Sequence, residues 1–173
     1  MTAEPNHHNA TILWIGGPAA AGKTTVSRLL AEKYGFHWYS VDSHAREHEE
    51  RAAAAGLHVM GTGPGDFDRK PMIMDDLRAL PAGTSVVVEG AAITPGMAGV
   101  AANAVWLMPS REEQVARLQR RHPEGGIDGY VWGWGLVQSQ LEGTGASVIV
   151  VDGQSVEQTL EAVEGQFSAE LAC

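Results

Sequence analysis

The chain has 173 residues, of which 44% are hydrophobic and 19% charged, and its formal net charge is −9. This length and composition predict one globular domain with a sizeable core. The acidic charge argues against a nucleic-acid partner, because phosphate backbones select basic surfaces. No apolar stretch reaches the ~18–20 residues of a membrane span, so no membrane partner is expected. The only cysteine, Cys173, excludes an intrachain disulfide framework and favours a cytoplasmic protein.

The polar N-terminal stretch is expected to form a flexible tail over residues 1–10, followed by a single domain over residues 11–173. Five β-rich runs alternate with helical patterns in this domain: Thr11–Gly16, His37–Val41, Ser85–Glu89, Ala104–Met108 and Ser147–Val151. Continuous apolar runs, such as Val148–Val151, are typical of strands buried on both faces of a parallel sheet. The alternation predicts an α/β three-layer sandwich with right-handed crossovers.

The sequence Gly17-Pro-Ala-Ala-Ala-Gly22-Lys23-Thr24 matches the phosphate-binding loop at every defined position, between an apolar run and a helical pattern. In such a loop the backbone N–H groups and the helix dipole together hold an anion. Lys23 then reaches the β- and γ-phosphates of ATP or GTP, and the Thr24 hydroxyl binds Mg²⁺. The nucleotide contacts expected here are Gly17, Ala21, Gly22, Lys23, Thr24 and Thr25.

Two carboxylates follow predicted strands, at the edge of the sheet where ligands bind. Asp42, after the second strand, can act as a base that orients an acceptor hydroxyl, or it can merely cap the next helix. Glu89, at the end of the third strand, can hold a Mg²⁺-bound water, contact the acceptor, or form a structural ion pair. We predict functional roles for both, with Gly90 beside them in the acceptor site.

The helix predicted after Asp42 carries His44, Glu47, His48 and Arg51 on one face. This face is either solvated or lines an acceptor pocket, and the sequence leaves both interpretations open. The match of His44–His48 to the H-x-x-E-H zinc motif is too short to indicate a protease. We interpret residues 43–80, with a glycine-rich loop at Gly61–Lys70, as an acceptor-binding insert.

A capping box at Ser110 predicts a helix that ends near Arg121. The glycine-rich residues 122–135, which contain Trp132 and Trp134, are predicted to form a mobile lid; an ordinary surface loop is the alternative. Arginines at the lid can stack on a nucleotide base and neutralise the transferred phosphoryl group. The candidates are Arg117, Arg120 and Arg121, of which Arg117 and Arg121 share a face and are the predicted catalytic pair.

On these residues the chain resembles the P-loop small-molecule kinases of the nucleoside-monophosphate-kinase-like group, such as gluconate kinase, shikimate kinase and chloramphenicol phosphotransferase. The resemblance runs from Ile12 to about Phe167. It is carried by Gly17–Thr25, Val41–Ser43, Arg117–Arg121, Leu136–Leu141 and Val150–Ser155. It implies a five-stranded parallel sheet in the order 2-3-1-4-5, a lid, and Mg²⁺-dependent phosphate transfer to a hydroxyl.

The resemblance also implies roles for individual residues. Asp42 matches the acceptor-activating aspartate of chloramphenicol phosphotransferase, and Asp152–Ser155 is similar to the adenine-contacting turn of gluconate kinase, which makes Gly153 and Ser155 nucleotide contacts. The acid-binding arginine of shikimate kinase has no counterpart, since no Lys or Arg follows Glu124. A neutral acceptor, such as an antibiotic, is therefore favoured.

The leading hypothesis is thus a phosphotransferase that uses ATP or GTP with Mg²⁺ and acts on a small-molecule hydroxyl, as a monomer or homodimer. A nucleotide or sugar-acid kinase of primary metabolism is the alternative within the same class. A nucleotide-sensing P-loop regulatory module is the alternative from another class.

Overall fold

The computed structural model describes residues 10–57 and 67–172. The predicted N-terminal tail, apart from Ala10, lies outside the described residues, as does the part of the glycine-rich loop before Phe67. The helices are α1 Lys23–Tyr34, α2 Ala45–Ala54, α3 Lys70–Arg78, α4 Pro95–Ala98, α5 Arg111–Arg121, α6 Asp128–Leu141, α7 Val156–Gln166 and α8 Ser168–Leu171, with a 3₁₀ helix at Asp42–His44.

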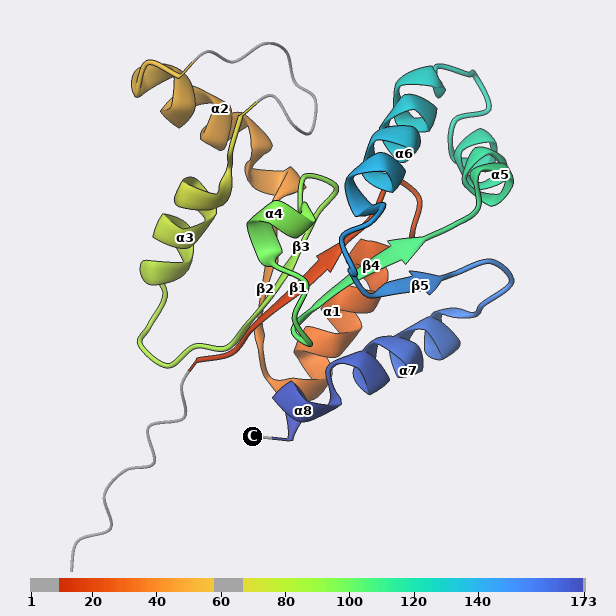
Figure 1. The fold of residues 1–173 in the computed structure, drawn as a ribbon. Coiled ribbons are helices and arrows are strands. Elements are labelled where there is room, and N and C mark those ends of the chain that lie inside the picture. Colours follow the sequence, from red (N-terminus) through yellow and green to blue (C-terminus); the bar gives the residue numbers. More distant parts are fainter. Residues whose placement is uncertain (1–9, 58–66, 173) are drawn as a thin grey trace, which may run out of the picture.

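Five parallel strands form the central sheet in the order β2-β3-β1-β4-β5 (Figure 1). The strands are β1 Ile12–Gly16, β2 His37–Ser40, β3 Val86–Glu89, β4 Ala104–Met108 and β5 Val148–Val150. Each predicted run therefore contains a strand, and the predicted α/β fold and strand order are confirmed. The register aligns Glu89 with Ile15 of β1 and Ser40 of β2, so the ends of three strands meet beside the loop that follows β1.

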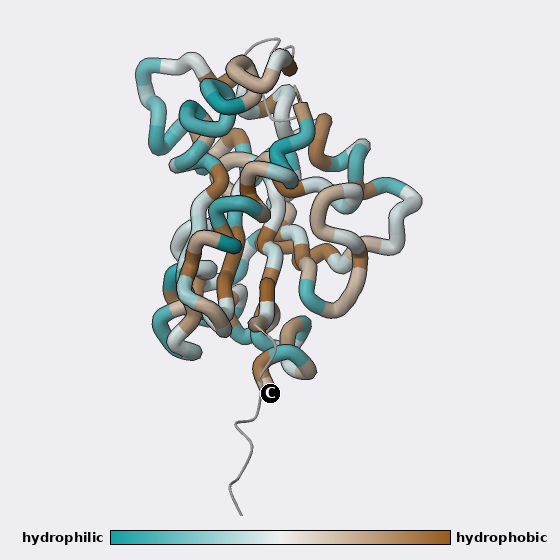
Figure 2. The backbone as a smooth tube through the Cα atoms, turned by 90° about the vertical axis from the view of Figure 1, so that its left-hand side faces the viewer, coloured by the Kyte–Doolittle hydropathy of each residue, from teal (hydrophilic) through white to brown (hydrophobic). Residues whose placement is uncertain are grey.

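Two apolar cores pack on opposite faces of the sheet. One joins side chains of β1, β3 and β4 to α1 and α7, with Leu30 and Phe167 fully buried. The other joins the opposite side chains of the strands to α3, α4 and α6 through Ile73, Met97 and Val137. The hydrophobic strands accordingly run through the middle of the molecule, between more polar helices (Figure 2). This is the three-layer arrangement that the alternation of elements predicts.

The prediction that the last strand is buried on both faces is wrong. Val148 is 44% exposed and Val150 is 60% exposed, while Ile149 between them packs on the core beside α7. The strand β5 forms the edge of the sheet, next to β4. An edge strand can expose one of its faces, so a continuous apolar run does not by itself establish burial on both faces.

The lid predicted over residues 122–135 is irregular only as far as residue 127, because α6 begins at Asp128. This helix forms although it contains Gly129, Gly133 and Gly135, which disfavour helices. Trp134 donates from Nε1 to the carbonyl oxygen of Pro109 at 2.8 Å, and Val137 is buried against the sheet. Tertiary packing thus outweighs the low helix propensity.

No helix within the described ranges is both long and apolar enough to cross a membrane.

Candidate functional site

The phosphate loop spans residues 17–24, between β1 and α1. Gly17 has φ 131°, and a Cβ there would lie 2.2 Å from the carbonyl oxygen of Leu107 on β4, so only glycine fits. Ala20 also has a positive φ, of 62°, which curls the loop tightly. Because α1 begins at Lys23, the positive end of its dipole faces the loop.

Lys23 lies within this loop rather than in solvent. Its side chain is 6% exposed, and Nζ donates to the carbonyl oxygen of Pro18 at 2.7 Å. Burial lowers the pKa of Lys23, the charges of Asp42 and Glu89 oppose this shift, and the charge of Arg121 adds to it. The two predicted carboxylates and one predicted arginine therefore act electrostatically on the same ammonium group.

Thr24 and Glu89 form a pair of oxygen donors beside Lys23. The Thr24 hydroxyl donates to Glu89 Oε1 at 3.4 Å. Glu89 is 1% exposed, and its Oε2 atom has no hydrogen-bond partner among the described residues. Burial raises the pKa of Glu89, with Asp42 adding to the shift, while hydrogen bonds from Ser40 and Thr24 and the charge of Lys23 oppose it.

This donor set fits Mg²⁺, which prefers oxygen ligands and keeps several waters. A hydroxyl and a carboxylate with one unpaired oxygen can hold the ion directly or through water. Within residues 10–57 and 67–172, no group of three or more His, Cys, Asp and Glu side chains could hold a metal ion.

Asp42 starts the 3₁₀ helix that follows β2, and its side chain is exposed. Neither that helix nor α2 has a side-chain cap, so the interpretation of Asp42 as a simple helix cap is not supported. A Cβ on Gly90 would lie 3.3 Å from Asp42 Oδ1 and 2.9 Å from the Cβ of Val41. The glycine predicted for the acceptor site thus lets the β3 end approach Asp42 closely.

A cavity of about 410 Å³ lies directly at Asp42. Pro18 and Ala19 of the phosphate loop line it on one side, and Ala91 after β3 lines another. Its remaining wall is the first part of α6, from Gly129 to Val137, which includes Tyr130 and Trp132. The cavity therefore joins the phosphate loop, Asp42 and the predicted lid region, which lie far apart in sequence.

His48 and Arg51 belong to a polar network that does not line this cavity. His48 Nε2 lies 3.1 Å from Tyr39 Oη and 3.0 Å from Asp76 Oδ2, and Tyr39 donates to the same Asp76 oxygen at 2.5 Å. Arg51 donates to Asp76 Oδ1 at 2.6 Å. Burial lowers the pKa of His48, while its bond to Asp76 opposes the shift. These contacts tie α2 to α3 and β2.

Neither interpretation of the polar face predicted after Asp42 fits all of its members. Glu47 is exposed, and His48 is fully buried and contacts neither solvent nor the cavity. His44 is half-buried two residues from Asp42; its ring stacks on Tyr39 at 4.3 Å between centroids, and Nδ1 lies 2.8 Å from the carbonyl oxygen of Ser40. Of the predicted acceptor contacts on this face, only His44 lies next to Asp42.

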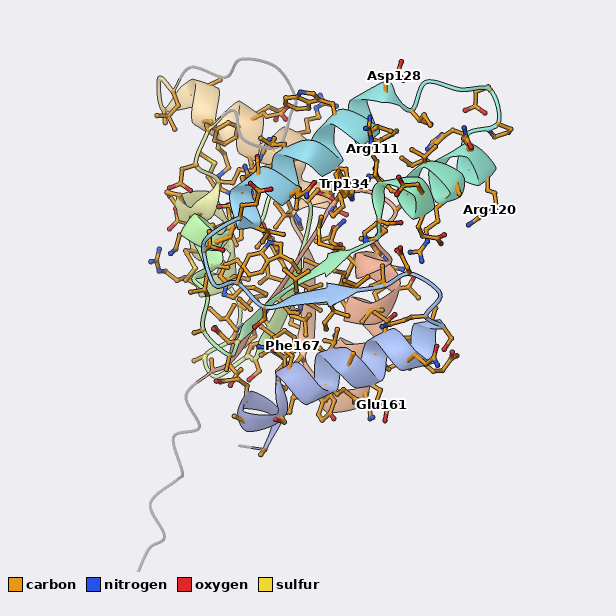
Figure 3. All side chains as sticks on the ribbon, turned by 45° about the vertical axis from the view of Figure 1, so that its right-hand side comes forward. Arg111, Arg120, Asp128, Trp134, Glu161 and Phe167 are labelled. Atoms are coloured by element: carbon orange, nitrogen blue, oxygen red, sulfur yellow. The ribbon has the colours of Figure 1, made fainter. Side chains whose placement is uncertain are left out.

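The three candidate arginines separate in the structure. Arg117 donates from Nη1 to the carbonyl oxygen of Ala20 and from Nη2 to that of Val151, both at 3.2 Å. Arg120 points away from the body of the protein, off the outer side of α5 (Figure 3). Arg121 is exposed, and its charge acts on Lys23. Arg117 thus contacts the phosphate loop, Arg121 is close enough for its charge to act on Lys23, and Arg120 points away.

The turn after β5 lies on the opposite side of β1 from Asp42, since β4 and β5 form that half of the sheet. Asp152 Oδ1 accepts a hydrogen bond from the backbone N–H of Ser110 at 2.7 Å, and Gly153 has φ 67°. The Ser155 hydroxyl accepts from the N–H of Gln158 at 3.2 Å and caps α7. Arg117 connects this turn to the phosphate loop.

Gln114 is a functional candidate that the sequence pattern did not indicate. It is fully buried, and its amide Nε2 donates to the carbonyl oxygen of Ala19 at 3.0 Å and to that of Tyr130 at 3.3 Å. Its Oε1 atom has no partner among the described residues. One side chain of α5 therefore connects the phosphate loop to the first turn of α6.

No family model matches the chain. Among curated proteins, a cytidylate kinase from Geobacillus kaustophilus (strain HTA426) is 34% identical over 123 residues, which cover 65% of this chain and 51% of that protein. The chain thus spans about half the length of this relative.

Among solved structures, a sugar kinase from Janibacter sp. HTCC2649 superposes with a TM-score of 0.66 at 20% identity, over 94% of this chain and 97% of that one. A gluconokinase from Sinorhizobium meliloti 1021 superposes with a TM-score of 0.58 at 15% identity, over 95% and 94%. The chain has the fold of the P-loop small-molecule kinases. The predicted resemblance is thereby confirmed. A tunicamycin resistance protein from Deinococcus radiodurans shares the fold, with a TM-score of 0.57 at 20% identity over 91% and 95%.

Proposed function

We propose that this P-loop protein transfers the γ-phosphate of ATP or GTP to a hydroxyl group of a small molecule. The observation that carries the proposal is the cavity that Asp42 shares with Pro18 and Ala19 of the phosphate loop. An acceptor bound there lies between a carboxylate and the loop that holds the donor phosphates. This is the arrangement that in-line transfer needs, since phosphoryl transfer depends mainly on positioning and charge stabilisation.

In the proposed step, the hydroxyl oxygen of the acceptor forms a bond to the γ-phosphorus, and Asp42 accepts the proton of that hydroxyl. The bond from the γ-phosphorus to the β–γ bridging oxygen breaks, and the nucleoside diphosphate leaves with that electron pair. Lys23 and Arg121 stabilise the negative charge on the transferred group, because Lys23 lies in the loop and the charge of Arg121 acts at the same place. Gly17, Ala21, Gly22 and Thr25 contribute the loop backbone.

Thr24 and Glu89 would hold Mg²⁺, directly or through water, when nucleotide is bound. The ion would supply charge neutralisation at the β- and γ-phosphate oxygens. On the other side of β1, Arg117, Gly153 and Ser155 would hold the nucleoside part of the donor. Arg117 already spans this region through its bonds to Ala20 and Val151.

On the acceptor side we assign Asp42, His44, Glu89 and Gly90 to the site itself. His48 and Arg51 would act indirectly, since their bonds to Asp76 hold α2 in place. The similarity in fold to a tunicamycin resistance protein supports the inclusion of hydroxylated antibiotics among the candidate acceptors.

A nucleotide kinase is the second candidate, favoured by the sequence similarity to a cytidylate kinase. A regulatory module that only binds nucleotide is the third.

A screen for acceptor-dependent release of nucleoside diphosphate separates these three functions. The acceptors are neutral alcohols, gluconate and cytidine monophosphate, and the readout is the added phosphate mass of the product. Our proposal predicts a phosphorylated alcohol. Phosphorylated cytidine monophosphate as the main product would support the nucleotide kinase, and nucleotide binding without transfer to any acceptor would support the module.

A further inference from the structure

The acceptor cavity is mainly apolar apart from Asp42, the proposed catalytic base. Pro18, Ala19, Ala91 and Val137 present aliphatic groups to it, and Asp42 is its one ionisable carboxylate among the described lining residues. Pockets that bind ligands are commonly apolar with a few polar groups that fix orientation. A cavity of about 410 Å³ is large enough for a drug-sized molecule.

Trp132 lines this cavity and also a neighbouring groove that Arg111 and Trp134 share, and it is largely uncovered. Its side chain is 65% exposed, more than any other large hydrophobic residue in the described part of the chain. An aromatic side chain carries a large apolar surface, and a flat ring of a ligand can stack on it. Tyr130, in the first turn of α6, also lines the cavity. It is 44% exposed, and its ring stacks on that of His122 at 5.5 Å between centroids.

The arginines of the 43–80 segment, which a carboxylate or phosphate acceptor could use, are engaged by carboxylates of the protein. Each arginine of the 43–80 segment that the sequence offers has a carboxylate partner: Arg46 with Glu50 at 3.0 Å, Arg51 with Asp76 at 2.6 Å, Arg69 with Glu49 at 3.2 Å, and Arg78 with Asp75 at 2.7 Å. None of the described residues that line the cavity is Lys or Arg. An anionic acceptor there would face the Asp42 carboxylate with no cationic side chain among the described residues that line the cavity.

The nucleotide base does not account for the cavity. Asp42 and Ala91 follow β2 and β3, whereas the turn assigned to the nucleoside follows β5, and β1 lies between the two halves of the sheet. The cavity is thus on the side of the phosphate loop away from that turn.

We propose that the acceptor is an uncharged molecule with an aromatic or otherwise apolar body and a hydroxyl that reaches Asp42, and that Trp132 determines specificity by stacking on that body. This inference rests on the proposed function, since it concerns the acceptor of the same reaction. It distinguishes the protein from sugar-acid and nucleotide kinases, whose acceptors carry charge.

The test measures binding and transfer separately, with the whole protein, Mg²⁺ and a non-hydrolysable ATP analogue in the binding arm. Phenyl-, naphthyl- and biphenyl-substituted ethanediols are titrated by calorimetry against gluconate and cytidine monophosphate. The diols are expected to bind more tightly than either anion. Tighter binding of gluconate or cytidine monophosphate, or no binding of any diol, would overturn the inference.

Trp132→Ala should weaken diol binding about 10-fold, whereas Trp132→Phe should retain most of it, because the ring contributes the stacking. Val131→Ala is the matched control, since Val131 precedes Trp132 on α6 and lines only the neighbouring groove with Arg111, whereas Trp132 lines both that groove and this cavity. Equal affinity of Trp132→Ala and wild type would contradict the assignment of Trp132. Diols that bind but are not phosphorylated with ATP would leave the binding inference intact and refute the proposed function.

Discussion

The Thr24 hydroxyl lies 3.4 Å from Glu89 Oε1, which joins the phosphate loop to the end of β3 across 65 residues of sequence. The second carboxylate oxygen of Glu89 is buried without a partner among the described residues. A buried, unpaired carboxylate oxygen is costly, so it commonly has a ligand, an ion or a functional role. We therefore expect this pair to bind Mg²⁺ together with the nucleotide.

Glu89→Gln should raise the Mg²⁺ concentration needed for half-maximal tightening of nucleotide binding by about 10-fold, because the amide retains the shape but not the charge. The measurement is calorimetric titration of a non-hydrolysable ATP analogue at a series of Mg²⁺ concentrations. Glu161→Gln is the control, because Glu161 points to solvent from α7 (Figure 3). The same Mg²⁺ dependence in both variants would refute the assignment of Glu89.

Gly17→Ala should destabilise the protein by about 3 kcal/mol or more. The new Cβ would clash with the carbonyl oxygen of Leu107, and the φ of Gly17 is positive. Gly35→Ala is the matched control. Gly35 also has a positive φ, of 67°, but nothing lies within 4 Å of its Cβ position. That variant should lose only about 1–2 kcal/mol. Urea denaturation measures both, and equal losses would show that the close approach at Gly17 has no energetic consequence.

Gln114→Met should lower kcat about 10-fold while the melting temperature stays within a few degrees, because one buried side chain links the loop carbonyl of Ala19 to that of Tyr130. Removing the unpaired Oε1 atom offsets part of the cost of the lost bonds. We treat Gln114 as a positioning residue. The measurement therefore compares the change in kcat with the change in melting temperature for the same variant. A lower melting temperature with unchanged kcat would indicate a purely structural role.

Asp76→Asn should remove about 2 kcal/mol of stability near neutral pH. Burial opposes ionisation of Asp76, but hydrogen bonds from Tyr39, His48 and Arg51 outweigh it and lower its pKa from 3.8 to about 2. Because the folded-state pKa is depressed, the stabilisation is fully present above the ordinary pKa and is lost as the pH falls through the folded one. The difference between variant and wild type should therefore shrink between about pH 4 and pH 2.

The control for this prediction is Asp75→Asn. Asp75 is 62% exposed, pairs with the exposed Arg78 at 2.7 Å and has only a long contact of 3.9 Å with Arg51, so its loss should cost under about 1 kcal/mol. Urea denaturation at several pH values measures both variants. A stability difference between Asp76→Asn and wild type that does not depend on pH would contradict the role given to the ionised carboxylate.

The phosphate loop and its place in the fold could be predicted from the sequence, because the signals are local. The phosphate loop needs Gly17, Gly22, Lys23 and Thr24 at fixed spacing, and the strand before it is a clear apolar run. The position of Asp42 beside the loop follows from its place after a parallel strand.

The cavity that we propose for the acceptor could not be predicted in the same way, because its wall comes from packing. Residues from Asp128 contain three glycines within eight positions and indicate a loop, yet burial of Val137 and the bond from Trp134 to Pro109 hold them in a helix. Gln114 has no sequence signal either, since a glutamine within an amphipathic helix usually faces solvent. His48 is likewise indistinguishable from its solvated neighbours until Asp76 is placed against it.

The most direct test of the central claim is the comparison of nucleotide affinity and phosphotransfer rate in Asp42→Asn. Asparagine keeps the size of the side chain but cannot accept the acceptor proton, and Asp42 makes no helix cap whose loss would confuse the result. We predict nucleotide affinity within about 2–3-fold of wild type and phosphotransfer lower by about 10²–10⁴-fold. Unchanged phosphotransfer in this variant would contradict the assignment of Asp42 as the base.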